Sequence, residues 1–128
     1  MDIPARLNLL LVDDEEDFAL TLAQRLGLRG VSAAVAFDGE SALTSLQQKQ
    51  FDLVVLDVHL PGASGLSILR RIREEHPDLP VVLLTGNTGA EDAALGMKQG
   101  AQACLTKPLE LQEFLALLAR LCTKEKRA

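Results

Sequence analysis

Carboxylates, a hydroxyl and a lysine follow the ends of apolar stretches in this 128-residue chain. These residues are Asp13 and Asp14 after LNLLLV, Asp57 after FDLVVL, Thr85 after PVVLL, and Lys107 just after AQACL. Three carboxylates that lie close together raise one another's pKa unless a cation compensates them. Oxygen ligands favour Mg²⁺, which usually also binds phosphate oxygens. This set therefore indicates phosphoryl transfer to an aspartate, with Mg²⁺, the lysine and the hydroxyl neutralising and orienting the phosphoryl group.

Five short apolar stretches predict the strands that bring these residues together. They cover residues 7–12, 31–37, 51–56, 80–84 and 101–105. Nearly continuous apolar strands are typical of a parallel sheet covered on both faces, and the segments between them have helical spacing. Parallel strands joined in this way need right-handed crossovers. The prediction is an α/β fold, a doubly wound (βα)5 sandwich with a five-stranded parallel sheet and its site at the carboxyl ends of the strands.

Composition excludes several other classes of protein. Hydrophobic residues make up 48% and charged residues 24%, which suits one globular domain. The net charge of −5 and the lack of Trp and Tyr argue against direct nucleic-acid binding by this domain. No apolar run could span a membrane, and the start MDIPARLN does not resemble a signal peptide. Cys104 and Cys122 match no metal spacing and are predicted to be buried thiols in a reducing cytoplasm.

Four motifs together resemble a known family. LLLVDDEEDF, FDLVVLDVHLPGASGL, VVLLTGNTG and LTKPL, in this order and spacing, resemble the receiver domain of two-component response regulators, of the chemotaxis-regulator type. The resemblance covers about residues 7–122, so residues 1–128 are expected to form a single receiver domain. Residues 123–128 would be a tail or the start of a linker to a missing output domain. Met1, just before the first predicted strand, is compatible with a stand-alone receiver and favours the N-terminal part of a longer regulator.

The resemblance implies a phosphorylation-activated signalling switch with the flavodoxin-like strand order 2-1-3-4-5. A sensor histidine kinase would donate the phosphoryl group, and an output domain or effector protein, for example a transcriptional one, would respond. The chain would not be an enzyme beyond its own phosphoryl transfer and autodephosphorylation. It would act in the cytoplasm and would contact neither membrane nor nucleic acid directly.

The resemblance also implies a role for each metal-site residue. Asp57 would be the phosphoacceptor and a ligand of the Mg²⁺ cofactor. Asp14 would coordinate the metal directly and Asp13 would do so through water. The backbone carbonyl of His59 would be a further ligand.

Three further residues would act on the phosphoryl group. Thr85 would bond a phosphoryl oxygen and shift toward it, and Lys107 would pair with the phosphoryl group or with Asp57. The Lys107-Pro108 bond is expected to be cis, which is uncommon enough to be a useful check. Asn87, two residues after Thr85, is expected either to modulate hydrolysis or to cap a helix.

Three positions differ from the commonest family pattern. Leu60 stands where Met is usual, and Gly86 stands where Ala is usual. Cys104 stands where many members have an aromatic ring that swings inward when the threonine moves. A thiol cannot report by ring rotation. We therefore expect the signal to reach the output face through backbone and helix shifts, or to be weaker.

The expected output face comprises the fourth helix, the fifth strand and the last helix. On the last helix, Leu117 and Leu121 widen the apolar stripe beyond what a surface helix needs, and Leu95 lies off the stripe of the fourth helix. The fourth stripe itself is predicted to contain Ala90, Ala93, Ala94 and Met97. The surplus leucines predict dimerisation or domain docking at this face.

Glu15, Glu16 and Asp17 are interpreted differently from the two acids before them. Their expected place is the first turn of the first helix, where the helix dipole favours negative charge.

Two alternative functions use a similar fold. A haloacid-dehalogenase-like phosphatase would also use a strand-end aspartate with Mg²⁺, but it needs a second aspartate two residues later, where this chain has His59. A flavodoxin-like FMN-binding module would need a phosphate-binding loop after the first strand, where the five acids would repel phosphate.

Overall fold

The sheet has the predicted architecture. The computed structural model describes residues 7–60, 64–86 and 90–125. Five parallel strands form one sheet in the order β2-β1-β3-β4-β5, which confirms the predicted fold class and strand order. The strands are β1 (Asn8–Val12), β2 (Ser32–Ala36), β3 (Leu53–Asp57), β4 (Val81–Thr85) and β5 (Ala103–Thr106). Each begins and ends within two residues of the predicted stretch.

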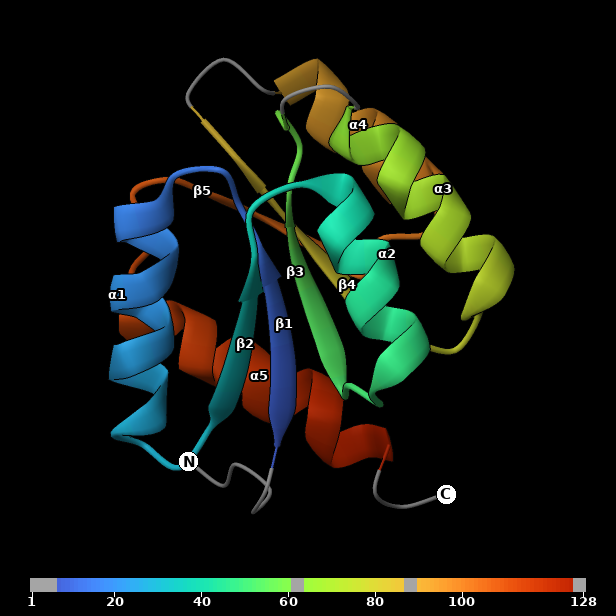
Figure 1. Ribbon diagram of the computed structural model, residues 1–128. Helices are drawn as coiled ribbons and strands as arrows, with labels where there is room; N and C mark the ends of the chain where they lie inside the picture. The colour runs from blue at the N-terminus through green and yellow to red at the C-terminus, as the bar shows by residue number, and fades with distance from the viewer. Residues whose placement is uncertain (1–6, 61–63, 87–89, 126–128) are drawn as a thin grey trace.

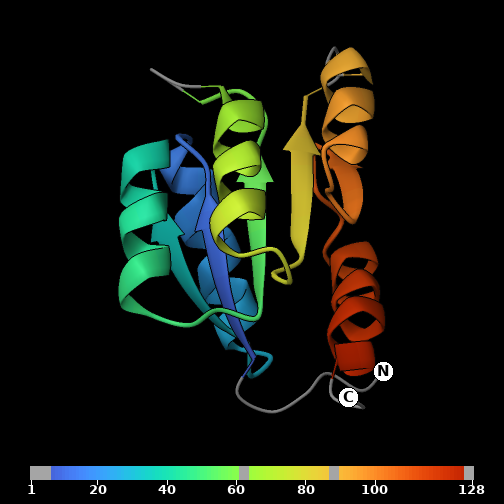
Figure 2. The same cartoon turned by 90° about the vertical axis from the view of Figure 1, so that its right-hand side faces the viewer.

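Five helices cover the two faces of the sheet. They are α1 (Glu16–Gly27), α2 (Gly39–Gln48), α3 (Gly65–Glu75), α4 (Ala90–Lys98) and α5 (Leu111–Glu125). Helices α1 and α5 lie on one face, and α2, α3 and α4 lie on the other (Figures 1 and 2). In the described part of the chain, no helix is long and apolar enough to cross a membrane.

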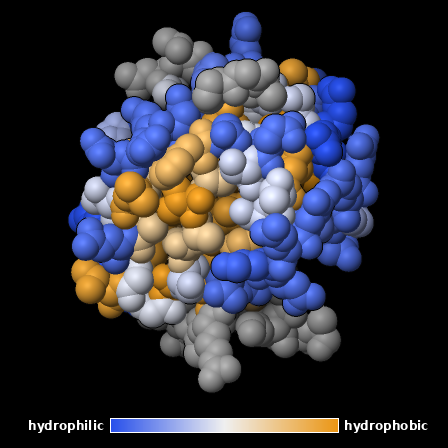
Figure 3. Space-filling view, viewed as in Figure 1, coloured by the Kyte–Doolittle hydropathy of each residue, from blue (hydrophilic) through white to orange (hydrophobic). Residues whose placement is uncertain are grey.

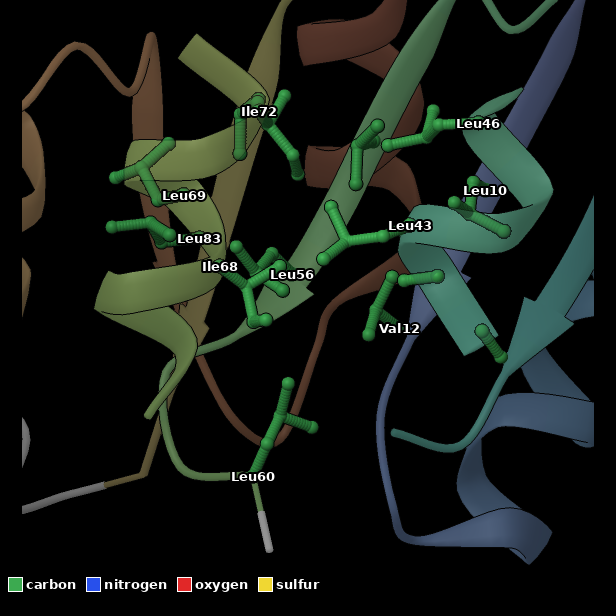
Figure 4. Packing of buried hydrophobic residues seen from close by; sticks show 14 of the residues in the cluster. Leu10, Val12, Leu43, Leu46, Leu56, Leu60, Ile68, Leu69, Ile72 and Leu83 are labelled. Carbon is green, nitrogen blue, oxygen red and sulfur yellow. The ribbon is translucent and has the colours of Figure 1, made fainter. Parts of the chain in front are cut away.

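Apolar side chains fill the space on both sides of the sheet. Because successive side chains of a strand point to opposite faces, Leu10 and Val12 of β1 pack under α2 and α3, whereas Leu9 and Leu11 pack under α1 and α5. Figure 4 shows the first of these two clusters, with Leu60 beside the end of β3. Two buried faces explain why the strand sequences are almost continuously apolar.

Helix α5 is buried more deeply than the sequence predicted. Leu117 is only 5% exposed and belongs to the cluster under α1 and α5, and Leu121 packs against the same cluster. The prediction that these two leucines form surplus apolar surface is therefore wrong. They complete the core because α5 presents a wide apolar face to the sheet.

Helix α4 is rotated relative to its predicted stripe. Met97 is 44% exposed and Ala94 is exposed, whereas Gly96 is buried. A Cβ atom at Gly96 would overlap the side chain of Leu83, so the missing side chain allows close packing of α4 on β4. The predicted apolar stripe is wrong for Ala94 and Met97, because a glycine, which carries no apolar side chain, marks the inward face of α4. Ala93 is partly buried, and the side chain of Ala90 lies outside the described part of the structure. Leu95 is exposed, as predicted.

The connection from β3 to α3 folds back tightly on the strand end. The backbone N–H of Gly65 donates a hydrogen bond to the carbonyl oxygen of Val58 at 2.8 Å. Ser64 then caps α3, because its Oγ accepts from the N–H of Ser67 at 3.2 Å. This return fixes the backbone at and just after Asp57.

Candidate functional site

Polar burial is concentrated at the carboxyl ends of the strands. Among the residues that the structure describes, the buried polar or charged residues are Asp13, Asp57 and Thr85. They follow or end β1, β3 and β4, which are adjacent in the sheet. Since burying a carboxylate without partners is costly, two buried aspartates in one place indicate a functional site rather than a contribution to stability.

Three carboxylates at this edge are close enough to share one cation. Asp13, Asp14 and Asp57 each offer an oxygen, and these oxygens lie within 4.8 Å of one another. Asp13 and Asp57 are buried, whereas Asp14 is exposed to solvent. Two buried carboxylates beside one exposed carboxylate suit a hard divalent cation that keeps some of its water.

Backbone hydrogen bonds orient both buried carboxylates. The N–H of Glu15 donates to Asp13 Oδ1 at 2.9 Å, and the N–H of His59 donates to Asp57 Oδ1 at 3.0 Å. Asp13 Oδ2 is also buried, and the Lys107 ammonium 2.9 Å away is its ion-pair partner. Both buried carboxylates are therefore held in fixed orientations at the strand ends.

Lys107 supplies positive charge to this cluster. Its Nζ lies 2.9 Å from Asp13 Oδ2, 3.3 Å from Asp57 Oδ2 and 2.5 Å from Glu15 Oε1. The Lys107-Pro108 bond is cis, as predicted, and the N–H of Lys107 donates to the carbonyl of Thr85 at 2.8 Å. Burial opposes the charge of Lys107, but the bonds to Glu15 and Asp13 and the charge of Asp57 outweigh it and raise the pKa of Lys107. The lysine therefore stays protonated.

One lysine does not fully compensate the carboxylates. Burial raises the pKa of Asp13, and the charge of Asp57 adds to this effect. The N–H of Glu15 and the ammonium of Lys107 act in the opposite direction without reversing the shift. The carboxylates of Asp13, Asp14, Asp57 and Glu15 also outnumber the single ammonium of Lys107, so an added divalent cation is electrostatically favoured.

Two residues of this site were not predicted. Glu15 precedes α1, which begins at Glu16, and its side chain bonds Lys107 instead of capping the helix. The interpretation of Glu15 as a first-turn residue is therefore wrong, whereas Glu16 and Asp17 do occupy that turn. Phe18 lies beneath Lys107, with Nζ 4.9 Å from the ring centroid. The sequence showed Phe18 only as part of an apolar stripe.

Thr85 and Cys104 lie side by side next to the carboxylates. Cys104 is only partly buried and packs against the cluster under α2 and α3, whereas Cys122 is buried, so the prediction of two buried thiols holds for Cys122 and only in part for Cys104. Burial raises the pKa of the Cys104 thiol, and a hydrogen bond with the Thr85 side chain lowers it in part. A small thiol thus occupies the place beside Thr85 where the family pattern has a ring.

His59 contacts helix α4 through a partner that the sequence did not indicate. Its Nε2 lies 3.1 Å from Asp92 Oδ2, and both side chains are largely exposed. The pair connects the loop after Asp57 to α4. Asn87, predicted as a modulating residue, lies outside the described residues.

The chain matches one protein family over most of its length. The sequence profile described as the response regulator receiver domain matches residues 9–119. The chain belongs to this family. Receiver domains are phosphorylation-dependent signalling switches and not classical enzymes, and they work with sensor kinases and output domains. The family assignment decides against the phosphatase and FMN-binding alternatives.

Relatives of known name or structure agree with this assignment. The transcriptional regulatory protein DltR of Streptococcus agalactiae is 39% identical over 119 residues, which are 93% of this chain and 53% of DltR. The receiver domain of NtrX from Brucella abortus has a TM-score of 0.85 at 33% identity and covers 90% of this chain and 98% of that one. A response regulator from Burkholderia pseudomallei, solved with a phosphorylated aspartic acid, a calcium ion and citrate, has a TM-score of 0.82 at 32% identity over 94% of this chain and 71% of that one. This receiver domain spans about half the length of DltR.

Proposed function

We propose that this receiver domain takes a phosphoryl group from a sensor histidine kinase onto Asp57, with Mg²⁺ as cofactor. The observation that carries the proposal is the burial of Asp57 between two further aspartates and Lys107. In the transfer a carboxylate oxygen of Asp57 bonds to phosphorus as the phosphorus–nitrogen bond of the phosphohistidine breaks. The phosphorylated aspartic acid named for the Burkholderia pseudomallei relative supports this assignment.

The carboxylates would hold the metal in distinct ways. Asp14 is exposed and would bind Mg²⁺ directly, whereas Asp13 would bind through a water molecule. Asp57 and the backbone carbonyl of His59 would complete the protein ligands. When bound, Mg²⁺ supplies charge neutralisation for the incoming phosphoryl oxygens.

Lys107 and Thr85 would hold the phosphoryl group after transfer. Lys107 already approaches Asp57, so its ammonium can pair with a phosphoryl oxygen after a small movement. Thr85 would donate its hydroxyl proton to another oxygen and leave its contact with Cys104. This movement of Thr85, and not a ring rotation, would pass the signal to α4.

The face formed by α4, β5 and α5 would pass the signal to an output domain, an effector protein or a second receiver domain. Leu95 and Met97 of α4 are 46% and 44% exposed and provide apolar surface for such a contact. Residues 123–128 would lead to the output domain, which is supported by the length of DltR. Transcriptional control is the proposed output, since DltR is a transcriptional regulatory protein.

Replacing Asp57 with asparagine tests the phosphoacceptor. Incubation of the wild type with a small-molecule phosphodonor and Mg²⁺ is expected to add one phosphoryl group per chain in an intact mass spectrum. Asp57→Asn is expected to add none, because the amide is not a nucleophile for this reaction. Asp17→Asn removes an exposed acid of α1 and should label like the wild type. Equal labelling of Asp57→Asn would overturn the proposal.

Replacing Asp13 with asparagine tests the metal ligands. Without Mg²⁺ the variant is expected to be at least as stable as the wild type at neutral pH, because the environment of Asp13 disfavours its charge. A saturating excess of about 100 times the Kd of Mg²⁺ should stabilise the wild type by about 2.7 kcal/mol. The variant should gain much less. Thermal unfolding with and without Mg²⁺ measures both effects, and an equal gain in both proteins would remove Asp13 from the ligand set.

A further inference from the structure

The β2 edge of the sheet presents apolar surface to solvent. Strand β2 pairs with β1 alone in the part of the chain that the structure describes, so its other side is open. Ala33, Ala34, Val35 and Phe37 are each only partly buried. Figure 3 shows this apolar surface over β2, with hydrophilic surface over α1 on one side and α2 on the other.

The backbone of β2 has hydrogen-bonding groups that point away from the sheet. The N–H of Ser32 donates to Leu7, and the carbonyl of Ala36 accepts from Asp13. The direction of these groups alternates along a strand. The backbone groups of Ser32, Ala34 and Ala36 therefore point toward β1, and those of Ala33 and Val35 point outward. This edge can therefore accept another strand.

The usual protection of an edge strand is missing here. Natural edge strands avoid pairing by carrying charged residues, proline or a bulge. The segment from Ser32 to Ala36 reads SAAVA and has neither charge nor proline, and its register with β1 is continuous. An unprotected edge of this kind favours a strand from a partner.

Charges at the two ends of β2 specify the direction of such a partner. Arg29 precedes the strand and donates from its guanidinium to the carbonyl of Arg25, whereas Asp38 follows the strand and accepts from Ser41. The hydrogen bonds to the backbone N–H and side chain of Ser41 lower the pKa of Asp38, so it is ionised at neutral pH. The strand thus has a positive end and a negative end. A second copy laid antiparallel would set each Arg29 near the partner's Asp38, whereas a parallel copy would oppose like charges.

We propose that two copies of this receiver domain associate through antiparallel pairing of their β2 strands, with Ala34 on the two-fold axis. In this register Ala33 of each copy faces Val35 of the other, so the outward backbone groups bond one another. Ala34 faces its own symmetry mate in a pair without hydrogen bonds, where opposing Cα atoms lie about 4.5 Å apart. The edge contact is small, so self-association is expected only at about tens of micromolar or above.

This interface is independent of the proposed phosphoryl-transfer function. Strand β2 lies at the opposite edge of the sheet from β5. Pairing at β2 therefore leaves the face formed by α4, β5 and α5 available. The tests use unphosphorylated protein without Mg²⁺, so their outcome does not depend on Asp57.

Cysteine cross-linking tests the symmetry of the pair. Ala34→Cys is expected to form a disulfide with residue 34 of a second copy under mild oxidation, with about tenfold more dimer than Ala33→Cys, whose symmetry mate is offset along the strand. Peptide mass mapping distinguishes the disulfide between the two residues 34 from any disulfide that involves Cys104. Equal cross-linking of the two variants, or none for Ala34→Cys, would overturn the proposed register.

Blocking the edge tests the interface itself. Ala33→Pro removes an outward N–H that the fold does not use, and proline is tolerated on such an edge. Sedimentation velocity should show self-association of the wild type weakened at least about tenfold in Ala33→Pro and unchanged in Leu95→Lys, which charges α4 instead. Thermal unfolding checks that Ala33→Pro is folded. A wild type that stays monomeric at several times these concentrations, or dimers lost only in Leu95→Lys, would refute the β2 interface.

Discussion

Replacing Gly65 with alanine is expected to lower the free energy of unfolding by about 3 kcal/mol. A Cβ atom at this position would overlap the carbonyl oxygen of Asp57, and it would approach Val58 Cα within 2.7 Å and Val58 O within 2.8 Å. These are backbone atoms, so no side chain can rotate to make room. The chain would have to move the strand end or the start of α3, and it would lose the hydrogen bond from Gly65 to Val58.

The same substitution should also impair phosphorylation, since the displaced backbone carries Asp57, the proposed phosphoacceptor. Urea unfolding measures the stability, and labelling by a phosphodonor measures the site. Gly86→Ala is the matched control because a Cβ atom at Gly86 would meet nothing within 4 Å. That control should change stability by less than about 1 kcal/mol. Equal losses in the two variants would show that the tight return at Gly65 is not what stabilises this loop.

The strands and their order were predictable because their pattern has one physical cause. A strand such as Leu53–Asp57, buried along its whole length, must be apolar almost throughout, and such a run is visible in the sequence. The inward face of α4 was not predictable in this way. It depends on Gly96, and only the three-dimensional structure reveals how closely α4 approaches Leu83.

In the candidate site, the residues at strand ends were predictable from the sequence, whereas the long-range side-chain contacts were not. The strand-end rule identified Asp13, Asp14, Asp57, Thr85 and Lys107, because the backbone alone determines where strand ends lie. It did not identify Glu15, whose partner Lys107 is 92 residues away, or Asp92, which contacts His59 across the loop. These contacts depend on how far side chains reach. The sequence therefore separated Asp13 and Asp14 from the acids of the first turn of α1, but it placed Glu15 with the wrong group.

Replacing Lys107 with methionine is expected to destabilise the metal-free protein by about 3 kcal/mol at neutral pH. Methionine keeps the apolar stem over Phe18 but removes the charge that faces Asp13 and Asp57. Two buried carboxylates would then remain without their cation, and removing one partner of a buried ion pair leaves the desolvation cost of the other. Lys98→Met, which removes an exposed ammonium on α4, should change stability by less than about 1 kcal/mol.

The loss of stability in Lys107→Met should depend on pH and on Mg²⁺, whereas a loss caused by poorer packing would depend on neither. The pKa of Asp13 is already raised by burial, and losing Lys107 removes an influence that lowers it. The folded variant then binds a proton more readily than the unfolded chain, so its deficit shrinks as the pH falls through the pKa of Asp13. Mg²⁺ at neutral pH should restore part of the lost stability, whereas NaCl of equal ionic strength should restore little, because the proposed Mg²⁺ site lies between the same carboxylates. Urea unfolding across pH, with each salt, measures these terms. A deficit that is constant in pH and indifferent to Mg²⁺ would mean that Lys107 stabilises the fold by packing and not by its charge.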